Sequence, residues 1–456
     1  MRATAAIAVL AAVLLAGCIE ARPFACTDDG QCGDQGRCEA SGWCSFPDAT
    51  CAGGRRYGEH AGDGLGGWCV GGGDGDGDGD GDGDGDGDPD GGADAAGAPD
   101  AEPAQPTPLV DLVAGSDHTC GRTAAGDVWC WGDDQYGQLG NGPAGSDGAP
   151  VPVAGLTGAV ALAAGEYHTC AIAAGGAVWC WGANDQGQLG DGSHDAHDVP
   201  MQVPGLPAAG ALAAGEFHTC AVDGGGAVRC WGRNAEGQLG DDSTMPSPSP
   251  VLVGGVTAAH IEADGDFTCV VGASGDASCW GHNAYGQLGL GNKNNKKEPV
   301  AIPWLAGAQR IAAGGDHLCG LLPAGTVMCS GRNAYGQLGD DSVTDRMNPI
   351  TVAGVADADR LVAGEWFTCV RRAAGVVCWG RNDDGEVGGA AGADRHLPGA
   401  AVPLPFTPSI LDAGERHACA LDGDGCAWCW GADDLGQVGD GASGGSGPRP
   451  TALPCK

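Results

Sequence analysis

The pattern of apolar and polar positions repeats along residues 109–456 with a period of about 50 residues. In the second copy, an apolar stretch at 159–163 precedes two alternating stretches at 169–173 and 177–181, which a glycine turn separates. A loop rich in Gly, Asn and Asp follows, and 200–203 is another short extended stretch. Period-2 alternation without helical periodicity predicts about four short strands in each copy.

Seven copies can be counted from their leading cysteines, which are Cys120, Cys170, Cys220, Cys269, Cys319, Cys369 and Cys419. Such repeats form stacked supersecondary units rather than independent sites. Seven four-stranded units arranged radially protect the sheet edges that an open sheet would expose. The sequence therefore predicts an all-β, seven-bladed β-propeller over residues 109–456. We expect the tail around Pro448–Leu453 to complete the first blade and so to close the ring.

Three phrases recur in the copies: His-Thr-Cys-Ala, Val-Trp-Cys-Trp-Gly and Asn-x-x-Gly-Gln-Leu-Gly-Asp. They resemble the repeat of the regulator of chromosome condensation family, also detected as a BNR-like repeat, and the resemblance implies a seven-bladed propeller. The eukaryotic namesake is a guanine nucleotide exchange factor for a nuclear GTPase, but no residue here matches its GTPase-contacting segment. The fold also resembles a secreted bacterial inhibitor of β-lactamases, which holds its target with loop aromatics at one end.

The N-terminus has the features of an export signal. Arg2 precedes an apolar run over residues 3–16 that is too short to span a bilayer comfortably. Residues 15–18, Leu-Ala-Gly-Cys, resemble the lipobox of bacterial lipoproteins. We therefore predict a lipoprotein signal peptide over 1–17 and lipidation of Cys18, with an ordinary secretory peptide as the alternative. Ile19 replaces the Asp of the known retention signal, which favours the outer over the inner membrane.

Residues 18–70 predict a small module held by disulfides. Besides Cys18 they contain Cys26, Cys32, Cys38, Cys44, Cys51 and Cys69, with few bulky side chains to form a core. Six cysteines allow 15 pairings, and the sequence does not choose among them. Zinc binding is a weaker reading, because the spacing lacks paired C-x-x-C units and the compartment is oxidising.

Residues 71–108 form an acidic linker rich in Gly, Asp and Pro, with Gly and Asp alternating from Gly73 to Asp88. Like charges repel along such a chain, so we predict a disordered, extended tether that holds the propeller off the membrane. Weak calcium binding is the alternative, but the run lacks the closing bidentate Glu of an EF-hand loop.

The formal charge of −37 excludes two classes of partner. Nucleic acid requires Lys and Arg to displace counterions, and anionic lipid headgroups require them too. We therefore expect no nucleic-acid partner and membrane contact through the lipid alone. Lys293, Lys296 and Lys297 form the one lysine cluster, which is best explained as a solvated loop tip.

Each copy carries two cysteines nine or ten residues apart around a short turn. This spacing places both partners opposite each other on adjacent antiparallel strands, within disulfide reach. In an oxidising compartment we predict the pairs Cys120–Cys130, Cys170–Cys180, Cys220–Cys230, Cys269–Cys279, Cys319–Cys329, Cys369–Cys378, Cys419–Cys429 and Cys426–Cys455. Buried free thiols are the alternative, since cysteine also packs as a small hydrophobe.

Positions that recur in every copy serve the blade, whereas positions that vary offer a surface on which a partner is recognised. One variable position lies just before the recurrent His or Phe, past a strand end, so its copies share one face. It holds Asp117, Tyr167, Phe217, Asp266, Asp316, Trp366 and Arg416. Aromatic residues and Arg dominate binding hot spots, so we predict a partner-binding ring. The alternative is that these side chains only pack between blades.

The recurrent histidines His118, His168, His218, His317 and His417 do not predict a metal site. Equivalent positions in different blades are spread around the ring and do not converge to zinc bond lengths. Phe267 and Phe367 occupy the same position in two copies, which favours packing with a satisfied hydrogen bond. The Gln-Leu-Gly triplets are interpreted as turns rather than phosphate loops, because no helix follows them. We expect neither a metal nor a cofactor.

Enzymatic motifs are weak in this sequence. H-E-x-x-H does not occur, and no catalytic residue is assigned. Arg233, Arg332 and Arg381 share one repeat position, which keeps a propeller-type glycan hydrolase as the alternative. An exchange-factor activity would rest on the family name alone, and export disfavours it. The sequence favours a monomeric, envelope-anchored, non-catalytic binding or scaffold lipoprotein with a protein partner.

Overall fold

The structure is a computed structural model that describes residues 37–38, 44–47, 55–57, 108–143, 145–441 and 446–452. The chain divides into two units, residues 1–96 and 97–456. The predicted signal peptide, Cys18, most of the Cys-rich module and residues 71–107 of the linker lie outside the described residues. No helix within the described ranges is long and apolar enough to cross a membrane.

The first unit contains one described sheet, in which the strands are antiparallel and follow the order β1 (Arg37–Cys38), β2 (Cys44–Pro47) and β3 (Arg55–Tyr57).

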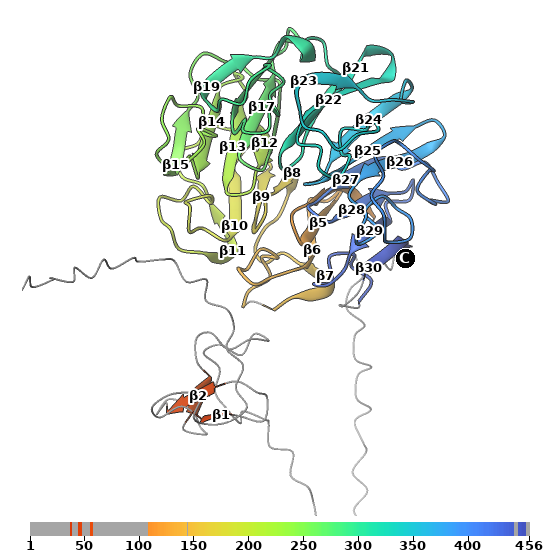
Figure 1. Cartoon of the computed structure of the whole chain (residues 1–456). Coiled ribbons are helices and arrows are strands. Elements are labelled where there is room, and N and C mark those ends of the chain that lie inside the picture. Colours follow the sequence, from red (N-terminus) through yellow and green to blue (C-terminus); the bar gives the residue numbers. More distant parts are fainter. Residues whose placement is uncertain are drawn as a thin grey trace, which may run out of the picture. The chain divides into compact units, whose positions relative to one another are not determined.

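The second unit consists of seven antiparallel sheets arranged as the blades of a propeller (Figure 1). Blade 1 contains β4 (Leu109–Ala114), β5 (His118–Thr123), β6 (Val128–Gly132) and β7 (Asp147–Pro152). Blade 2 contains β8 (Ala159–Ala164), β9 (His168–Ala173), β10 (Val178–Gly182) and β11 (His197–Gln202). Blade 3 contains β12 (Ala209–Ala214), β13 (His218–Asp223), β14 (Val228–Gly232) and β15 (Ser247–Leu252).

Blade 4 contains β16 (His260–Asp264), β17 (Phe267–Val271), β18 (Ala277–Gly281) and β19 (Lys296–Ala301), and the short 3-10 helix η2 (Pro303–Leu305) follows it. Blade 5 contains β20 (Arg310–Ala313), β21 (His317–Leu322), η3 (Pro323–Gly325), β22 (Thr326–Gly331) and β23 (Arg346–Thr351). Blade 6 contains β24 (Ala358–Ala363), β25 (Phe367–Arg372) and β26 (Gly375–Gly380). Blade 7 contains β27 (Ile410–Ala413), β28 (His417–Leu421), β29 (Ala427–Ala432) and β30 (Ser446–Ala452).

The predicted seven-bladed propeller is confirmed, but the predicted role of the tail is wrong. Strand β30 pairs with β29 and is the outer strand of blade 7, while blade 1 has its own outer strand, β7. Each Pro-containing outer strand pairs with the third strand of the copy that precedes it in the sequence, with Cys130 opposite Val151 and Cys429 opposite Thr451. All strands of a blade are therefore contiguous in sequence, and the ring is not closed by strand exchange.

Each blade is cross-linked by a disulfide between its second and third strands. Cys170 and Cys180 lie opposite each other in the β9–β10 register, with a Cα–Cα distance of 4.1 Å. The same bond occurs at all seven predicted blade pairs, with Cα–Cα distances of 4.0 to 4.1 Å. Cys426 is also disulfide-bonded, but its predicted partner, Cys455, lies outside the described residues. A disulfide that closes a loop this short contributes about 2–3 kcal/mol of stability.

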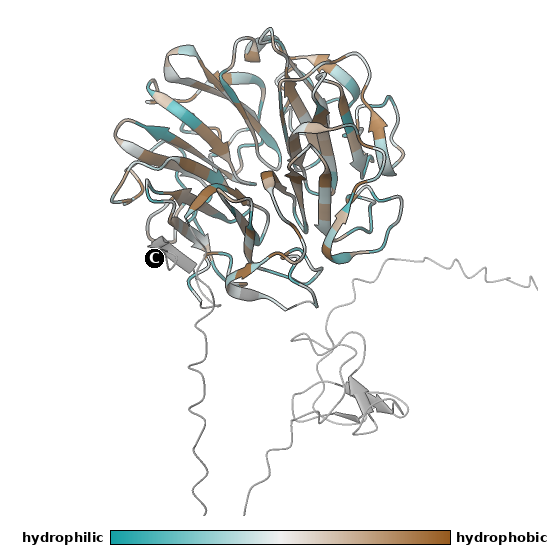
Figure 2. Ribbon diagram, turned by 180° about the vertical axis from the view of Figure 1, so that it is seen from behind, coloured by the Kyte–Doolittle hydropathy of each residue, from teal (hydrophilic) through white to brown (hydrophobic). Residues whose placement is uncertain are grey.

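The core lies between neighbouring blades. Apolar positions concentrate on the strands of the propeller, as Figure 2 shows by colour. At the junction of blades 1 and 2, Val128 and Leu139 of one blade form a single buried cluster with Leu162 and Trp181 of the next. Every blade therefore depends on its neighbours for the burial of its apolar face.

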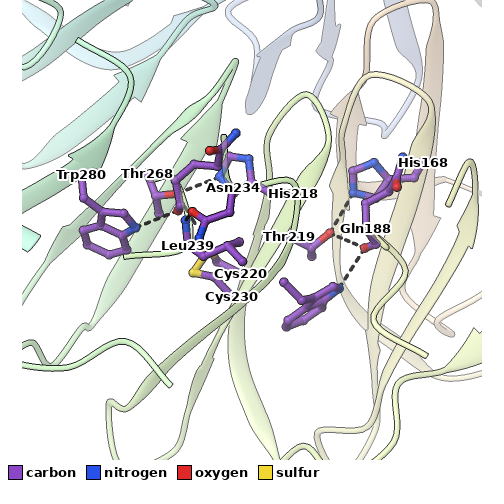
Figure 3. Close-up of a disulfide and its surroundings, with 12 residues drawn as sticks. His168, Gln188, His218, Thr219, Cys220, Cys230, Asn234, Leu239, Thr268 and Trp280 are labelled. Carbon is purple, nitrogen blue, oxygen red and sulfur yellow. Dashed lines mark hydrogen bonds between the residues drawn. A yellow bond between two sulfur atoms is a disulfide. The ribbon is translucent and has the colours of Figure 1, made fainter. Parts of the chain in front are cut away.

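A recurrent set of hydrogen bonds, here called the clasp, joins each blade to the next. In the third blade, Thr219 Oγ1 and Trp231 Nε1 both donate to the carbonyl oxygen of Gln188 in the second, at 2.8 Å (Figure 3). Because the Thr219 hydroxyl is used as a donor, it must accept from His168 Nε2, 2.8 Å away. His168 is therefore neutral with its proton on Nε2, and burial lowers the pKa of this imidazole to about 3.

The recurrent Gln-Leu-Gly triplet is explained by the same clasp. Gly190 has φ of 73°, and a Cβ at this position would lie 2.6 Å from Trp231 Nε1. A glycine is therefore required for the loop backbone to approach the indole closely enough for the Gln188 carbonyl to accept its hydrogen bond.

The ring closes through the same clasp. Thr119 Oγ1 and Trp131 Nε1 of blade 1 donate to the carbonyl oxygen of Gln437 in blade 7, at 3.2 and 3.0 Å. His417 Nε2 lies 2.7 Å from Thr119 Oγ1, as in the other His–Thr pairs. Non-covalent bonds between equivalent residues thus replace the strand exchange that we had expected.

The clasp varies in a correlated way at two junctions. Leu318 and Ala418 stand where the other blades have Thr, and the preceding blades carry Phe267 and Phe367 in place of His. An apolar pair thus replaces the His–Thr pair, and no imidazole is left without its acceptor. In blade 5, Ser330 replaces Trp and donates its hydroxyl to the Gln287 carbonyl at 2.7 Å.

Candidate functional site

The seven variable positions predicted to bind a partner lie in equivalent turns, between the first and second strands of each blade. Because the strand order is the same in every blade, the turns open on one end of the propeller, at the mouth of its central channel. All seven side chains are half-buried. We call this set the ring: Asp117, Tyr167, Phe217, Asp266, Asp316, Trp366 and Arg416.

The loop after the third strand of each blade, here the Gln loop, lies beside the ring residue of the next blade. In blade 3, Asn234 Oδ1 accepts the Leu239 N–H at 3.0 Å, and Gln238 Oε1 accepts the Glu236 N–H at 3.0 Å. The side-chain amide of Gln238 then donates to Asp266 Oδ1 of blade 4 at 2.5 Å. The recurrent Asn and Gln thus fix the loop backbone and support the ring.

Aromatic side chains form one arc over blades 1 to 3. The ring centroid of Tyr167 lies 5.1 Å from that of Tyr136, which belongs to a Gln loop, and 6.2 Å from that of Phe217. Arg233 lies 5.8 Å above Phe217 and pairs with Asp266 at 2.9 Å. Two tyrosines, a phenylalanine and an arginine therefore form a continuous strip.

A second arc covers blades 4 to 6. Arg332 lies 5.0 Å from the centroid of Tyr285 and pairs with Asp316 at 3.2 Å. Tyr335 lies 5.6 Å from Trp366, and Arg381 lies 4.6 Å from the centroid of the Trp366 ring. The arginines and aromatics thus alternate around the mouth.

These contacts bear on both interpretations of the ring, which are partner binding and packing between blades. Tyr167 and Trp366 do pack against the Gln loop of the preceding blade, as the packing alternative expects. The same side chains keep part of their surface open to solvent at the mouth. Partner binding by the ring stays a prediction.

The three arginines of the hydrolase alternative are each engaged separately. Arg233 pairs with Asp266 and Arg332 with Asp316, while Arg381 pairs with Asp383 at 2.9 Å. Each guanidinium also lies over an aromatic ring of its own. Such pairs hold the arginines in a rigid surface rather than directing them together at one substrate group.

A collar of carboxylic acids surrounds the channel just inside the ring. The residues directly before the ring positions include Glu166, Glu216, Glu365 and Glu415, which line a cavity of about 490 Å³. Burial raises the pKa of Glu365, and its hydrogen bond with Glu415 and the negative charge there raise it further. The collar thus holds carboxyl groups that retain protons at neutral pH.

Three further acids line the channel on the innermost strands. Desolvation inside the channel raises the pKa of Glu262, whose side chain is exposed to the channel, to about 8 and the pKa values of the half-buried Asp264 and Asp412 to about 7. Asp412 also accepts the Ala114 N–H of the next blade at 2.9 Å, and this hydrogen bond opposes the increase in the pKa of Asp412.

The tyrosines of the Gln loops and the acidic collar were not predicted from the sequence. Tyr136, Tyr285 and Tyr335 occupy a variable position two residues before the recurrent Gln. The collar follows from the recurrent Ala-Gly-Glu phrase. Both signals are visible in the repeat, but only the fold shows that the loop of one blade adjoins the ring residue of the next.

Family models described as regulator of chromosome condensation (RCC1) repeat match the propeller at eight places. The matched residues are 125–172, 175–222 and 274–321 for one model, and 109–138, 159–188, 211–238, 309–337 and 410–437 for the other. The propeller of this chain carries RCC1 repeats. No curated protein matches the chain.

Solved structures of RCC1-type propellers share the fold. Yeast RCC1 (Prp20) bound to Kap60 is 23% identical, with a TM-score of 0.64, over 76% of this chain and 85% of that one. Prp20p from Saccharomyces cerevisiae, studied with its binding to Gsp1p and histones, is 24% identical over 76% of this chain and 87% of that one, with a TM-score of 0.63. Human WBSCR16 is 21% identical over 68% of this chain and 86% of that one, with a TM-score of 0.61. At this identity the similarity establishes the fold alone.

The channel acids predict that the melting temperature falls as the pH rises from 6.5 to 8.5. Their folded pKa values, about 7 to 8, lie above the ordinary values of 3.8 and 4.5, so their stabilising contribution is lost progressively over that interval, and the last part of the loss falls between pH 6.5 and 8. Below pH 6.5 the buried histidines act in the opposite direction, because burial lowers their pKa to about 3 or 4.

Thermal melts of the double variant Glu262→Gln/Asp264→Asn test whether these acids cause the pH dependence. The fall in melting temperature with rising pH should become shallower in this variant. The matched control is Glu298→Gln, on the exposed strand β19, which should leave the slope unchanged. An identical slope in the double variant and the native chain would rule out these acids as its source.

Proposed function

We propose that this RCC1-repeat protein is a non-catalytic binding or scaffold protein that captures a protein partner with the ring and the Gln loops. The observation that carries the proposal is the alternation of aromatic residues and arginines around the mouth, held by a recurrent frame. Aromatic and Arg side chains dominate binding energy at protein interfaces. Their pre-organisation by ion pairs and cation–π contacts lowers the entropy cost of binding.

Other propellers of this fold support a protein partner. One similar structure is that of yeast RCC1 (Prp20) bound to Kap60, and Prp20p has been studied with its binding to Gsp1p and histones. We transfer the mode, protein recognition by a propeller, and not the partners. The charge of −37 disfavours partners that bind through their own negative charge.

The proposal places the protein outside the cytoplasm, lipid-anchored through Cys18 and favouring the outer membrane. Seven blade disulfides support this location, because disulfides persist in oxidising compartments and are rare in the cytosol. Mass spectrometry of the mature chain tests the anchor. We expect Cys18 to be the acylated first residue, and an unmodified or different first residue would refute it.

Affinity capture with the full chain, followed by mass spectrometry, tests the binding function. We expect Phe217→Ala and Trp366→Ala to reduce the captured partner at least tenfold, since hot-spot aromatics contribute about 2 kcal/mol or more. Leu252→Ala, at a 58% exposed site on β15 outside the ring and the Gln loops, is the matched control and should retain the partner.

Melting curves recorded on the same variants separate binding from folding. Loss of the partner with an unchanged melt supports the proposed function. Loss of folding in both ring variants would instead show that the ring packs between blades and is not a binding surface.

A further inference from the structure

The side-chain amide of the recurrent Gln has a hydrogen-bond acceptor at most blade junctions. Where the next ring residue is Asp, the amide donates to it: Gln238 to Asp266 at 2.5 Å, Gln287 to Asp316 at 3.4 Å and Gln437 to Asp117 at 2.9 Å. Where the next ring residue is Tyr167 or Phe217, the amide finds an Asp in its own loop, as Gln138 does with Asp133 and Gln188 with Asp185.

Gln337 is the exception. Its ring neighbour is Trp366, and its Nε2 has no hydrogen-bond partner among the described residues. The side chain is 0% exposed, and its Oε1 accepts the Tyr335 N–H at 3.0 Å, which fixes the amide orientation. By equivalence with Gln238 and Gln437, the amide nitrogen is directed toward the ring position.

Trp366 supplies a second buried donor without an acceptor. Its Nε1 also has no partner in the described part of the chain, whereas the recurrent indoles of the clasp, such as Trp379, donate to a carbonyl. Trp366 packs with Tyr335 and Arg381, and Gln337 is joined to this cluster through the Tyr335 N–H that its Oε1 accepts. A buried donor without an acceptor destabilises the folded state, so the cluster is poised to receive an oxygen atom.

The surrounding charges decide which oxygen fits. Arg381 is already paired with Asp383 at 2.9 Å and lies 3.6 Å from Glu386. The side chains of Asp383 and Asp434 on the rim are 58% and 54% exposed. A second carboxylate would meet this negative rim, whereas a neutral carbonyl oxygen would not. Basic side chains next to that carbonyl would be attracted to the rim.

We propose that Gln337 and Trp366 form an anchoring subsite for a main-chain carbonyl oxygen of a cationic polypeptide. Tyr335 and Trp366 contact the flanking peptide, and Asp383 and Asp434 attract its Lys or Arg side chains. This inference rests on the proposed function, because it specifies the chemistry of the partner at one part of the ring.

The binding test pans a random peptide library displayed on phage against the immobilised full chain, then measures synthetic copies of the selected peptides. We expect basic peptides whose affinity falls about tenfold with Trp366→Phe, which removes one donor, and with Gln337→Met, which removes the other donor together with the acceptor of the Tyr335 N–H. The indole N–H resonance of Trp366 should shift downfield when the peptide binds to ¹⁵N-tryptophan-labelled protein.

A stability test uses the repeat itself. Trp366→Asp would give Gln337 the acceptor that Asp266 gives Gln238, so the variant should melt at the same or a higher temperature while losing the peptides. Phe217→Asp is the matched control, because Gln188 already donates to Asp185 and gains nothing. A lower melting temperature for Trp366→Asp than for Phe217→Asp would contradict the assigned role of Gln337.

The outcomes separate the two proposals. Peptides that lose binding with Phe217→Ala, yet keep full affinity for Trp366→Phe and Gln337→Met, overturn this inference and leave the proposed function standing. Selected peptides that are acidic also overturn it. Peptides that bind without dependence on any ring residue, or a library that yields none, contradict both.

Discussion

The carbonyl oxygen of the recurrent Gln is the point on which the propeller depends. At Gln188 this one acceptor receives a hydroxyl and an indole from the next blade, in a site without solvent. A buried carbonyl left without donors would cost about 1–3 kcal/mol, so each blade specifies where its neighbour must lie. The same acceptor sits in the Gln loop, and the geometry that joins the blades therefore also places the side chains of the mouth.

This arrangement separates two roles within each repeat. The Gln, Gly, Thr and Trp of the clasp recur because each one completes a contact with the neighbouring blade, whereas the recurrent Asn fixes the Gln loop of its own blade. The ring position is free to vary, since the clasp does not pass through its side chain. The mouth and the channel also contain groups that are unusual in a folded protein, namely carboxyl groups with raised pKa values and buried hydrogen-bond donors without acceptors. Such exceptions are expected at functional sites.

Much of the fold was predictable because its signals are local. Period-2 alternation, glycine turns and cysteines spaced around a hairpin each concern residues within about ten positions of one another, which is why the blades and their disulfides follow from sequence. The tail was misassigned because the pairing of an outer strand is not encoded by its own pattern. Ser446–Ala452 has the same character whether it pairs with β29 or with the first copy.

The candidate site was predictable only in part. The variable position carrying Phe217 and Trp366 could be found by comparing copies, but its Gln-loop neighbours could not. The exchange of His–Thr for Phe267–Leu318 and Phe367–Ala418 is also present in the sequence. It becomes meaningful only when residues about 50 positions apart are known to touch. The unpartnered amide of Gln337 depends on the identity of Trp366 across a blade junction, which no single repeat reveals.

The most direct test of the account is a double-mutant cycle at the clasp, measured as the free energy of unfolding. Thr219→Leu alone should cost about 1–3 kcal/mol, because it leaves His168 Nε2–H buried without an acceptor. Adding His168→Phe should recover much of that loss and give a favourable coupling of about 1–2 kcal/mol, as the natural Phe–Leu pair implies. Additive losses in the two single variants, with no coupling, would contradict the clasp as the interaction that joins the blades.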